Sequence, residues 1–305
     1  MMTRPRPHAL LLAVTALATA PPLAAQAPVV TSADWLAAHR SDPDVVILHA
    51  GRQKADYDAG HVPGARWIDW AAYAPSADGL SVQLPPPDQL RQALAAAGVR
   101  DDSHIIVTGG AIQVTGRLFY TLEYFGFAGR VSLLDGGLAA WKAAGQPVDT
   151  SPGAGAASGA NAGTARGSVA LHPVPTKQVG AVALLADTAA RGVSILDARL
   201  PEFYTGSSAG GQPRAGHIPG ARNIPYNSTL GADGRFLGRE ALQGIFDAAG
   251  VPRGNRVVTY CHIGMQASAL YVAARLLGYD AAVYDGSWEE WSRKADYPAA
   301  VRPTP

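Results

Sequence analysis

Short apolar runs alternate with segments of helical spacing through the first half of the chain. Residues 45–48, 105–107 and 131–134 are rich in β-branched and other apolar side chains, which is typical of buried strands. Residues 87–97 and 117–125 instead place apolar side chains three and four positions apart, as amphipathic helices do. Strands that alternate with helices predict a mainly parallel sheet flanked by helices.

The second half repeats this arrangement. Strands are expected at residues 194–196, 256–260 and 282–283, and helices near residues 240–249 and 266–277. The predicted fold class is therefore α/β, with two tandem domains that each contain a mainly parallel sheet flanked by helices.

Three blocks of sequence also occur twice, in the same order. The pairs are residues 61–66 with 217–222, residues 104–110 with 256–261, and residues 134–141 with 284–291. In the second pair, Gly110 stands opposite Cys261. The two halves are therefore interpreted as copies of one unit.

Composition marks the boundary between the halves. Residues 150–167 are rich in Ala, Gly and Ser and contain no aromatic side chain, which is typical of a flexible linker. We expect one domain at residues 28–150 and another at residues 168–305, joined by a linker over residues 151–167.

The first 25 residues have the pattern of a secretory signal peptide. Arg4 and Arg6 precede an apolar stretch at residues 9–20, small residues follow it, and we expect cleavage after Ala25. The stretch is shorter than the roughly 20 residues of a membrane-spanning helix, and no later stretch is apolar enough to span. We expect export across the inner membrane, into the periplasm if the source is Gram-negative; the alternative is an uncleaved anchor.

Composition and charge exclude several kinds of partner and site. Of 305 residues, 48% are hydrophobic, which excludes a disordered chain, and 25 basic against 24 acidic residues leave a charge of +1. Without a long basic run, nucleic acid is not an expected partner. A single cysteine, Cys261, cannot form an intramolecular disulfide or a multi-cysteine metal site, so it is either inert packing or chemistry.

The position of Cys261 favours chemistry. It follows the expected strand 256–260 and opens the loop 261–266 before a helix, the place where open α/β sheets bind ligands. Unpaired N–H groups and the helix dipole there favour an anion, and Gly264 permits a close turn around the sulfur. We therefore expect the thiol pKa to lie below its reference value of about 8.5.

Several motifs, taken together with the repeat, resemble the two-domain form of the rhodanese family, which includes thiosulfate and 3-mercaptopyruvate sulfurtransferases. They are Asp197-Ala-Arg199 after a strand, the block 216–221, the cysteine loop, and Asp285-Gly286 with Trp291. The resemblance covers about residues 30–300. It implies two rhodanese-like domains, of which the carboxyl-terminal one is catalytic, and a first half that cannot form a persulfide because it has Gly110.

The resemblance implies a double displacement. The Cys261 thiolate would take sulfane sulfur from a small anionic donor such as thiosulfate, release sulfite and hold a persulfide, which cyanide or a thiol then removes. No metal or organic cofactor is expected, and the protein is expected to be a monomer. For donor binding we expect His262, Ile263, Gly264, Met265, Gln266, Arg199, Arg214 and His61.

Other interpretations of these residues stay open. Arg199 could instead pair with an acid such as Glu202, Arg214 could be a solvated loop charge, His61 could be structural, and His262 could carry partial positive charge. The loop has neither the basic residues usual in thiosulfate enzymes nor the small ones of mercaptopyruvate enzymes. We expect thiosulfate as donor because of the secretory address, with 3-mercaptopyruvate, or a sulfur carrier without turnover, as alternatives.

A phosphatase of similar fold is the other enzyme class that uses a strand–loop–helix cysteine. Its loop carries an arginine that grips phosphate, at the place of Ala267 in this chain. Without that guanidinium the main charge clamp for phosphoryl transfer is missing, so this class is disfavoured.

Overall fold

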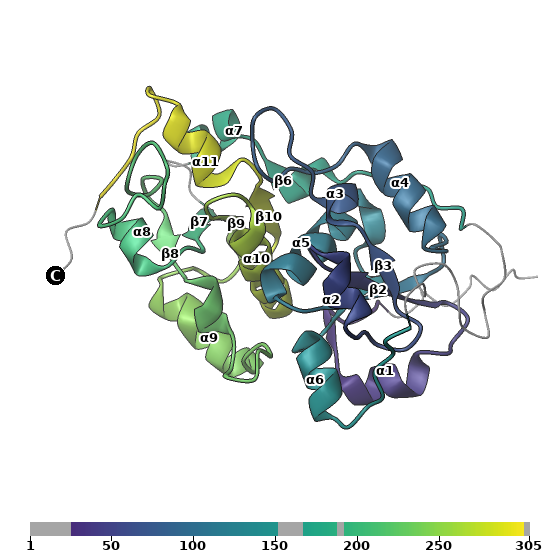
Figure 1. The fold of residues 1–305 in the computed structure, drawn as a ribbon. Coiled ribbons are helices and arrows are strands. Elements are labelled where there is room, and N and C mark those ends of the chain that lie inside the picture. The colour runs from purple at the N-terminus through teal and green to yellow at the C-terminus, as the bar shows by residue number, and fades with distance from the viewer. Residues whose placement is uncertain (1–25, 152–166, 188–191, 302–305) are drawn as a thin grey trace, which may run out of the picture.

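The computed structural model describes residues 26–151, 167–187 and 192–301 (Figure 1). The expected signal peptide and residues 152–166 of the expected linker lie outside these residues. Among the described residues, no helix is both long and apolar enough to cross a membrane.

The amino-terminal half contains a five-stranded parallel sheet. Its order is β1-β5-β4-β2-β3, and every pairing is parallel. The strands are β1 (Val30–Thr31), β2 (Val45–Ala50), β3 (Arg66–Ile68), β4 (His104–Gly109) and β5 (Val131–Leu134). The helices are α1 (Ala33–His39), α2 (Lys54–Asp58), α3 (Trp70–Tyr73), α4 (Pro87–Ala96), α5 (Ile112–Leu122) and α6 (Gly137–Ala143), with a π-helical turn η1 (Glu123–Phe127).

The carboxyl-terminal half repeats this topology. Its sheet has the order β6-β10-β9-β7-β8, again parallel throughout. The strands are β6 (Gln178–Val179), β7 (Val193–Asp197), β8 (Arg222–Asn223), β9 (Arg256–Tyr260) and β10 (Ala281–Tyr284). The helices are α7 (Ala181–Asp187), α8 (Pro201–Thr205), α9 (Arg239–Ala248), α10 (Met265–Leu277) and α11 (Ser287–Arg293), with 3-10 turns η2 (Pro175–Lys177) and η3 (Tyr226–Thr229). The predicted fold class, with two tandem α/β units, is confirmed.

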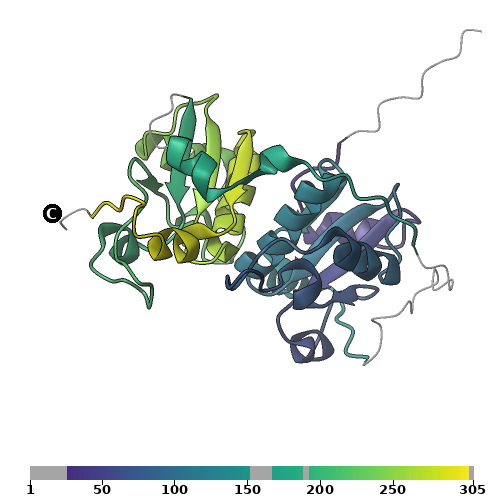
Figure 2. The same cartoon turned by 90° about the horizontal axis from the view of Figure 1, so that it is seen from above.

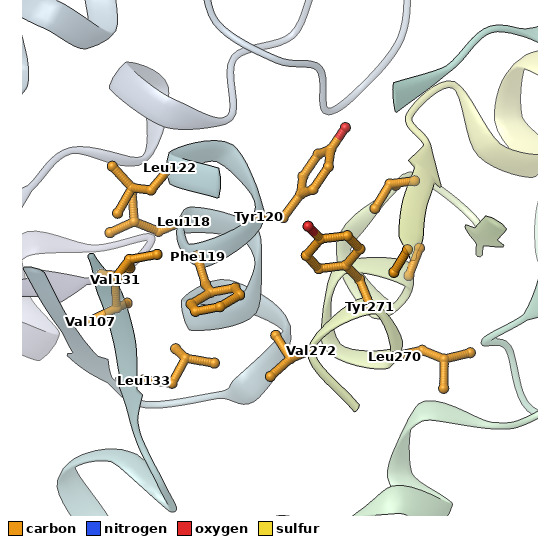
Figure 3. Close-up of a cluster of buried hydrophobic side chains, with 14 of the residues drawn as sticks. Val107, Leu118, Phe119, Tyr120, Leu122, Val131, Leu133, Leu270, Tyr271 and Val272 are labelled. Carbon is orange, nitrogen blue, oxygen red and sulfur yellow. The ribbon is translucent and has the colours of Figure 1, made fainter. Parts of the chain in front are cut away.

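The two halves meet through the helices that follow their central strands. Figure 2 shows the two sheets in separate units that lie side by side, and Figure 1 shows α5 and α10 between them. Gly116 of α5 allows a close approach, because a Cβ there would lie 3.3 Å from the Cα of Ala269 in α10. Nearby, the rings of Tyr120 and Tyr271 pack at 5.3 Å across the interface (Figure 3). One continuous apolar core therefore joins the domains.

A buried polar cluster continues the same interface toward the carboxyl end of α10. The Glu123 carboxylate, which is 2% exposed, accepts hydrogen bonds from Arg275 Nε at 3.0 Å and Lys177 Nζ at 3.2 Å, and one from the Tyr271 hydroxyl. Burial by itself would raise the pKa of Glu123, but the charges of Lys177 and Arg275 outweigh burial and lower the pKa. The cluster therefore ties η1 of one domain to α10 of the other.

Candidate functional site

The Cys261 loop connects the carboxyl end of β9 to the amino end of α10. Cys261 is 1% exposed, and its Sγ accepts a hydrogen bond from the Gly264 backbone N–H at 3.2 Å. The Cys261 backbone N–H donates to Ser287 Oγ at 3.2 Å, and its carbonyl accepts from Trp288 N at 2.9 Å. The start of α11 therefore anchors the residue that carries the thiol.

The predicted convergence of main-chain amides on the sulfur is present, but its effect on acidity is smaller than expected. Burial raises the pKa of the Cys261 thiol, and backbone N–H groups of Ala267, Ile263, Gly264 and Gln266 lower it without compensating fully. The expectation of a lowered thiol pKa is therefore wrong. The physical reason is that the thiolate would lose nearly all of its water at this buried position.

Gly264 is required by the space around it as well as by its backbone angle. Its φ is +89°, a left-handed conformation that side chains disfavour. A Cβ at this position would lie 3.1 Å from Asp285 Oδ1 and 3.2 Å from Arg117 Nη1. The loop therefore packs directly on an ion pair.

That ion pair is formed across the domain interface and was not predicted from the sequence. Arg117 of α5 donates to both carboxylate oxygens of Asp285, with Nη2 at 3.2 Å from Oδ2, and the side chains are 0% and 1% exposed. Asp285 Oδ2 also accepts from Leu84 N at 2.7 Å. Arg117 is the only charged residue of α5, and an isolated charge in an apolar helix is the signal that could have singled it out.

A second buried pair flanks the thiol from within its own domain. Arg199 Nε donates to Asp197 Oδ1 at 2.9 Å, and Nη2 donates to the Gly216 carbonyl at 2.8 Å. Its guanidinium carbon lies 4.9 Å from the ring centre of Trp288. The ion pair expected as an alternative role exists, although the acid is Asp197 and not Glu202.

Both arginines lie within electrostatic reach of the sulfur. Burial lowers the pKa of each guanidinium, and the paired aspartate, with a smaller effect of Cys261, raises it above its ordinary value. Arg117 and Arg199 are therefore permanently charged, yet each is neutralised by a carboxylate.

The loop side chains add no charge to the site. Burial and then the Arg199 charge lower the pKa of His262 to about 4, so the idea that His262 is partly protonated is wrong at neutral pH. Its ring packs edge-on against Phe203 at 4.6 Å. Ile263 and Met265 pack partly buried on the core, and Gln266 Oε1 is buried with no hydrogen bond from any described residue.

Two of the predicted donor-binding residues are used elsewhere. Arg214 donates to the backbone carbonyls of Ser292, Tyr297, Trp291 and Lys294 at 2.8–3.0 Å, which uses all three guanidinium nitrogens to hold the end of α11. The prediction that Arg214 binds the donor therefore loses its support.

His61 lies inside the amino-terminal domain. Its Nδ1 bonds to the carbonyl of Tyr57 at 2.9 Å, and its ring stacks on that of Tyr57. His217 makes the corresponding contacts with Tyr204 in the other domain. The repetition favours the structural role for His61.

The equivalent place in the amino-terminal domain has no cysteine. β4 begins at His104 and β9 at Arg256, and these two residues occupy the same place in their sheets. Counted from them, Gly109 is the equivalent of Cys261, one position before Gly110, which the sequence comparison had placed opposite the cysteine. A Cβ at Gly109 would lie 2.2 Å from the Ala50 carbonyl oxygen. A cavity of about 290 Å³ lies beside this turn, lined among others by Gly110 and Asp135.

Among the described residues, no group of three or more His, Cys, Asp or Glu side chains could hold a metal ion. The fold and the loop define a tandem α/β protein whose single cysteine lies buried between a strand and a helix.

Comparison with known proteins identifies the family of this chain. The model of the rhodanese-like domain matches residues 32–144 and 181–294. The chain is 34% identical over 243 residues to SseB of Mycobacterium tuberculosis, provisionally named a thiosulfate sulfurtransferase, with 78% of this chain and 82% of that protein covered. It is 31% identical over 279 residues to 3-mercaptopyruvate sulfurtransferase of Escherichia coli, with 87% and 95% covered.

Among solved structures, the ergothioneine biosynthesis enzyme of Chlorobium limicola superposes with a TM-score of 0.79 at 20% identity, with 90% of this chain and 71% of that chain covered. That likeness concerns the fold. The chain belongs to the rhodanese family, as its sequence motifs indicated.

Proposed function

We propose that this protein is a sulfurtransferase that carries sulfane sulfur on Cys261 as a persulfide. The observation that carries the proposal is the convergence of backbone amides on the sulfur of the single cysteine, at a strand-to-helix loop. Such amides stabilise the anion that forms when sulfur is added to a thiolate.

The reaction would proceed in two displacements. After the thiol loses its proton, the Cys261 sulfur attacks the outer sulfur of the donor, and the sulfur–sulfur bond of thiosulfate breaks so that sulfite leaves with the electron pair. The acceptor, cyanide or a thiolate, then attacks the outer sulfur of the persulfide. Thiocyanate or a new persulfide leaves, and the Cys261 thiolate is restored.

For the donor we propose thiosulfate, because the signal-like segment 1–25 is expected to export the protein to a compartment where 3-mercaptopyruvate is scarce. A second candidate donor is 3-mercaptopyruvate. It is favoured by the pairing of Arg117 and Arg199 with carboxylates. A site with little net charge suits the monoanion 3-mercaptopyruvate better than the dianion thiosulfate.

Steady-state assays with the purified protein test both proposals. Thiocyanate formation from thiosulfate and cyanide should be fast in the native chain and absent in Cys261→Ser, and equal rates would overturn the enzyme proposal. Higher kcat/KM with 3-mercaptopyruvate would overturn the donor preference. Uptake of one sulfur by mass, without turnover on either donor, would instead identify a sulfur carrier.

Export is tested separately. We expect the full chain to be processed after Ala25 and recovered in the periplasmic fraction of a Gram-negative host. An unprocessed chain that stays with the cytoplasm would contradict this proposal and leave the sulfur chemistry unaffected.

A further inference from the structure

Arg117 belongs to the domain without the cysteine, yet it lies against the reactive loop of the other domain. Its guanidinium pairs with Asp285, and its Nη1 lies 3.2 Å from the position that a Cβ on Gly264 would occupy. The N–H of Gly264 in turn donates to Cys261 Sγ. Arg117 is therefore connected to the sulfur through Asp285 and Gly264.

One nitrogen of Arg117 remains unpaired at this place. Nε is fully buried and has no hydrogen bond to any described residue. Buried donors in proteins are nearly always paired, so an unpaired one calls for an explanation, of which a catalytic role is one. The guanidinium therefore keeps one donor free in the interior, beside the loop that would carry the anion.

Two other charged side chains that cross the interface are more exposed than Arg117 and lie away from the cysteine loop. Arg275 bonds to Glu123 near η1, and Arg293 reaches the Gly79 carbonyl from α11. Both side chains are partly exposed, at 26% and 46%, and neither contacts the cysteine loop through the bonds it makes. They hold the domains together without contact to the thiol, and so they serve as comparisons for Arg117.

We propose that Arg117 is a positioning residue for sulfur transfer, supplied by the amino-terminal domain to the active site of its partner domain. Through Asp285 and Gly264 it holds the loop that surrounds Cys261, and its charge stabilises the thiolate and the persulfide anion. The inference rests on the proposed chemistry of Cys261, and it gives the cysteine-free domain a direct part in that chemistry.

The ionisation of Cys261 tests this role independently of turnover. Because the chain has one cysteine, thiolate absorbance in the ultraviolet, corrected with Cys261→Ser, reports this thiol alone. In Arg117→Met the titration midpoint should rise by about one pH unit or more, since the nearby cation is lost. Arg117→Lys should restore part of the shift, and the control Arg275→Met should titrate like the native chain.

A second variant keeps the test decisive if Arg117→Met does not fold. Asp285→Asn leaves the guanidinium without its carboxylate, so the thiol midpoint should fall, in the opposite direction to Arg117→Met. A purely structural ion pair predicts no such fall. An unchanged or higher midpoint in Asp285→Asn, or native titration in Arg117→Met, overturns the proposal.

Activity assays supply the second readout. In Arg117→Met we expect kcat for thiocyanate formation to fall about tenfold or more, while Arg275→Met stays near the native value. Shifted titration with no activity in any chain, the native one included, would reject the proposed sulfurtransferase function and, with it, a role of Arg117 in sulfur transfer, and would leave only the effect of Arg117 on the ionisation of Cys261.

Discussion

At the scale of single residues, the proposed sulfur transfer depends on how the buried sulfur of Cys261 can become an anion. Cys261 is nearly fully covered, and the amides around it do not offset the loss of water. The loop pattern predicted the amides correctly. It could not predict the burial, because Arg117 and Leu84, which bond to Asp285 beside the loop, come from distant parts of the chain.

The raised pKa of Cys261 predicts a marked dependence of its reactivity on pH. Below its pKa a thiol gains about tenfold in thiolate per pH unit, so alkylation of Cys261 by iodoacetamide should accelerate steadily from about pH 7 to about pH 9. Stopped-flow or mass-based rates, compared with free cysteine under the same conditions, measure this. A rate already constant between about pH 6 and about pH 8 would show a lowered pKa instead.

At the scale of secondary structure, the long central strands were predictable and the short edge strands were not. β2, β4 and β5 consist mainly of apolar residues, whereas β8 contains only Arg222 and Asn223. Two polar residues carry no periodicity, and their strand conformation comes from pairing with β7. The helix expected at residues 117–125 begins earlier, at Ile112. The sequence does not mark this start, because the helix has no side-chain cap at its amino end.

The polar cluster at the end of α5 is expected to contribute substantially to stability. Glu123→Gln would leave Lys177 and Arg275 partly buried without their carboxylate, and we expect a loss of about 3 kcal/mol in the free energy of unfolding. Urea unfolding measures it. Asp88→Asn, which breaks the exposed pair with Arg91, is the matched control and should cost less than about 0.5 kcal/mol.

The contribution of Glu123 also has a definite pH dependence. Because its pKa is lowered in the folded state, the stabilisation is complete above the ordinary carboxyl pKa and disappears as pH falls through the folded value. The difference in stability between Glu123→Gln and the native chain should therefore shrink in acid. A difference that grows as pH falls would contradict the lowered pKa.

At the scale of the whole molecule, the two copies share one topology but differ in the residues at the ends of their central strands. His49 and Gly51 stand at the places of Asp197 and Arg199, and the ring of Trp67 fills the space beside Gly51. The sequence showed that the first copy has no cysteine. It could not show which groups cross between the copies, because no local pattern encodes contacts between domains.

This division predicts that a cysteine alone will not restore the first site. Gly110→Cys has room, since a Cβ there meets nothing within 4 Å, but only two residues separate β4 from α5, against four between β9 and α10. After treatment with thiosulfate, we expect the intact mass of the Gly110→Cys single variant to increase by one sulfur, which Cys261 carries. The double variant Gly110→Cys/Cys261→Ser should gain none. A second added sulfur would show that the anion-binding turn is dispensable.

Each domain donates a backbone hydrogen bond to an aspartate that follows a strand of the other domain. The backbone N–H of Leu84, from the first domain, donates to Asp285 at 2.7 Å, and that of Phe236, from the second, donates to Asp135 at 2.9 Å. A loop of each domain thus contacts the carboxyl end of a strand in the other domain, β10 in one direction and β5 in the other. A carboxyl-terminal half produced in isolation would therefore keep Cys261 but lose the Leu84 N–H and the Arg117 guanidinium, so that the Asp285 carboxylate would turn to water for its partners.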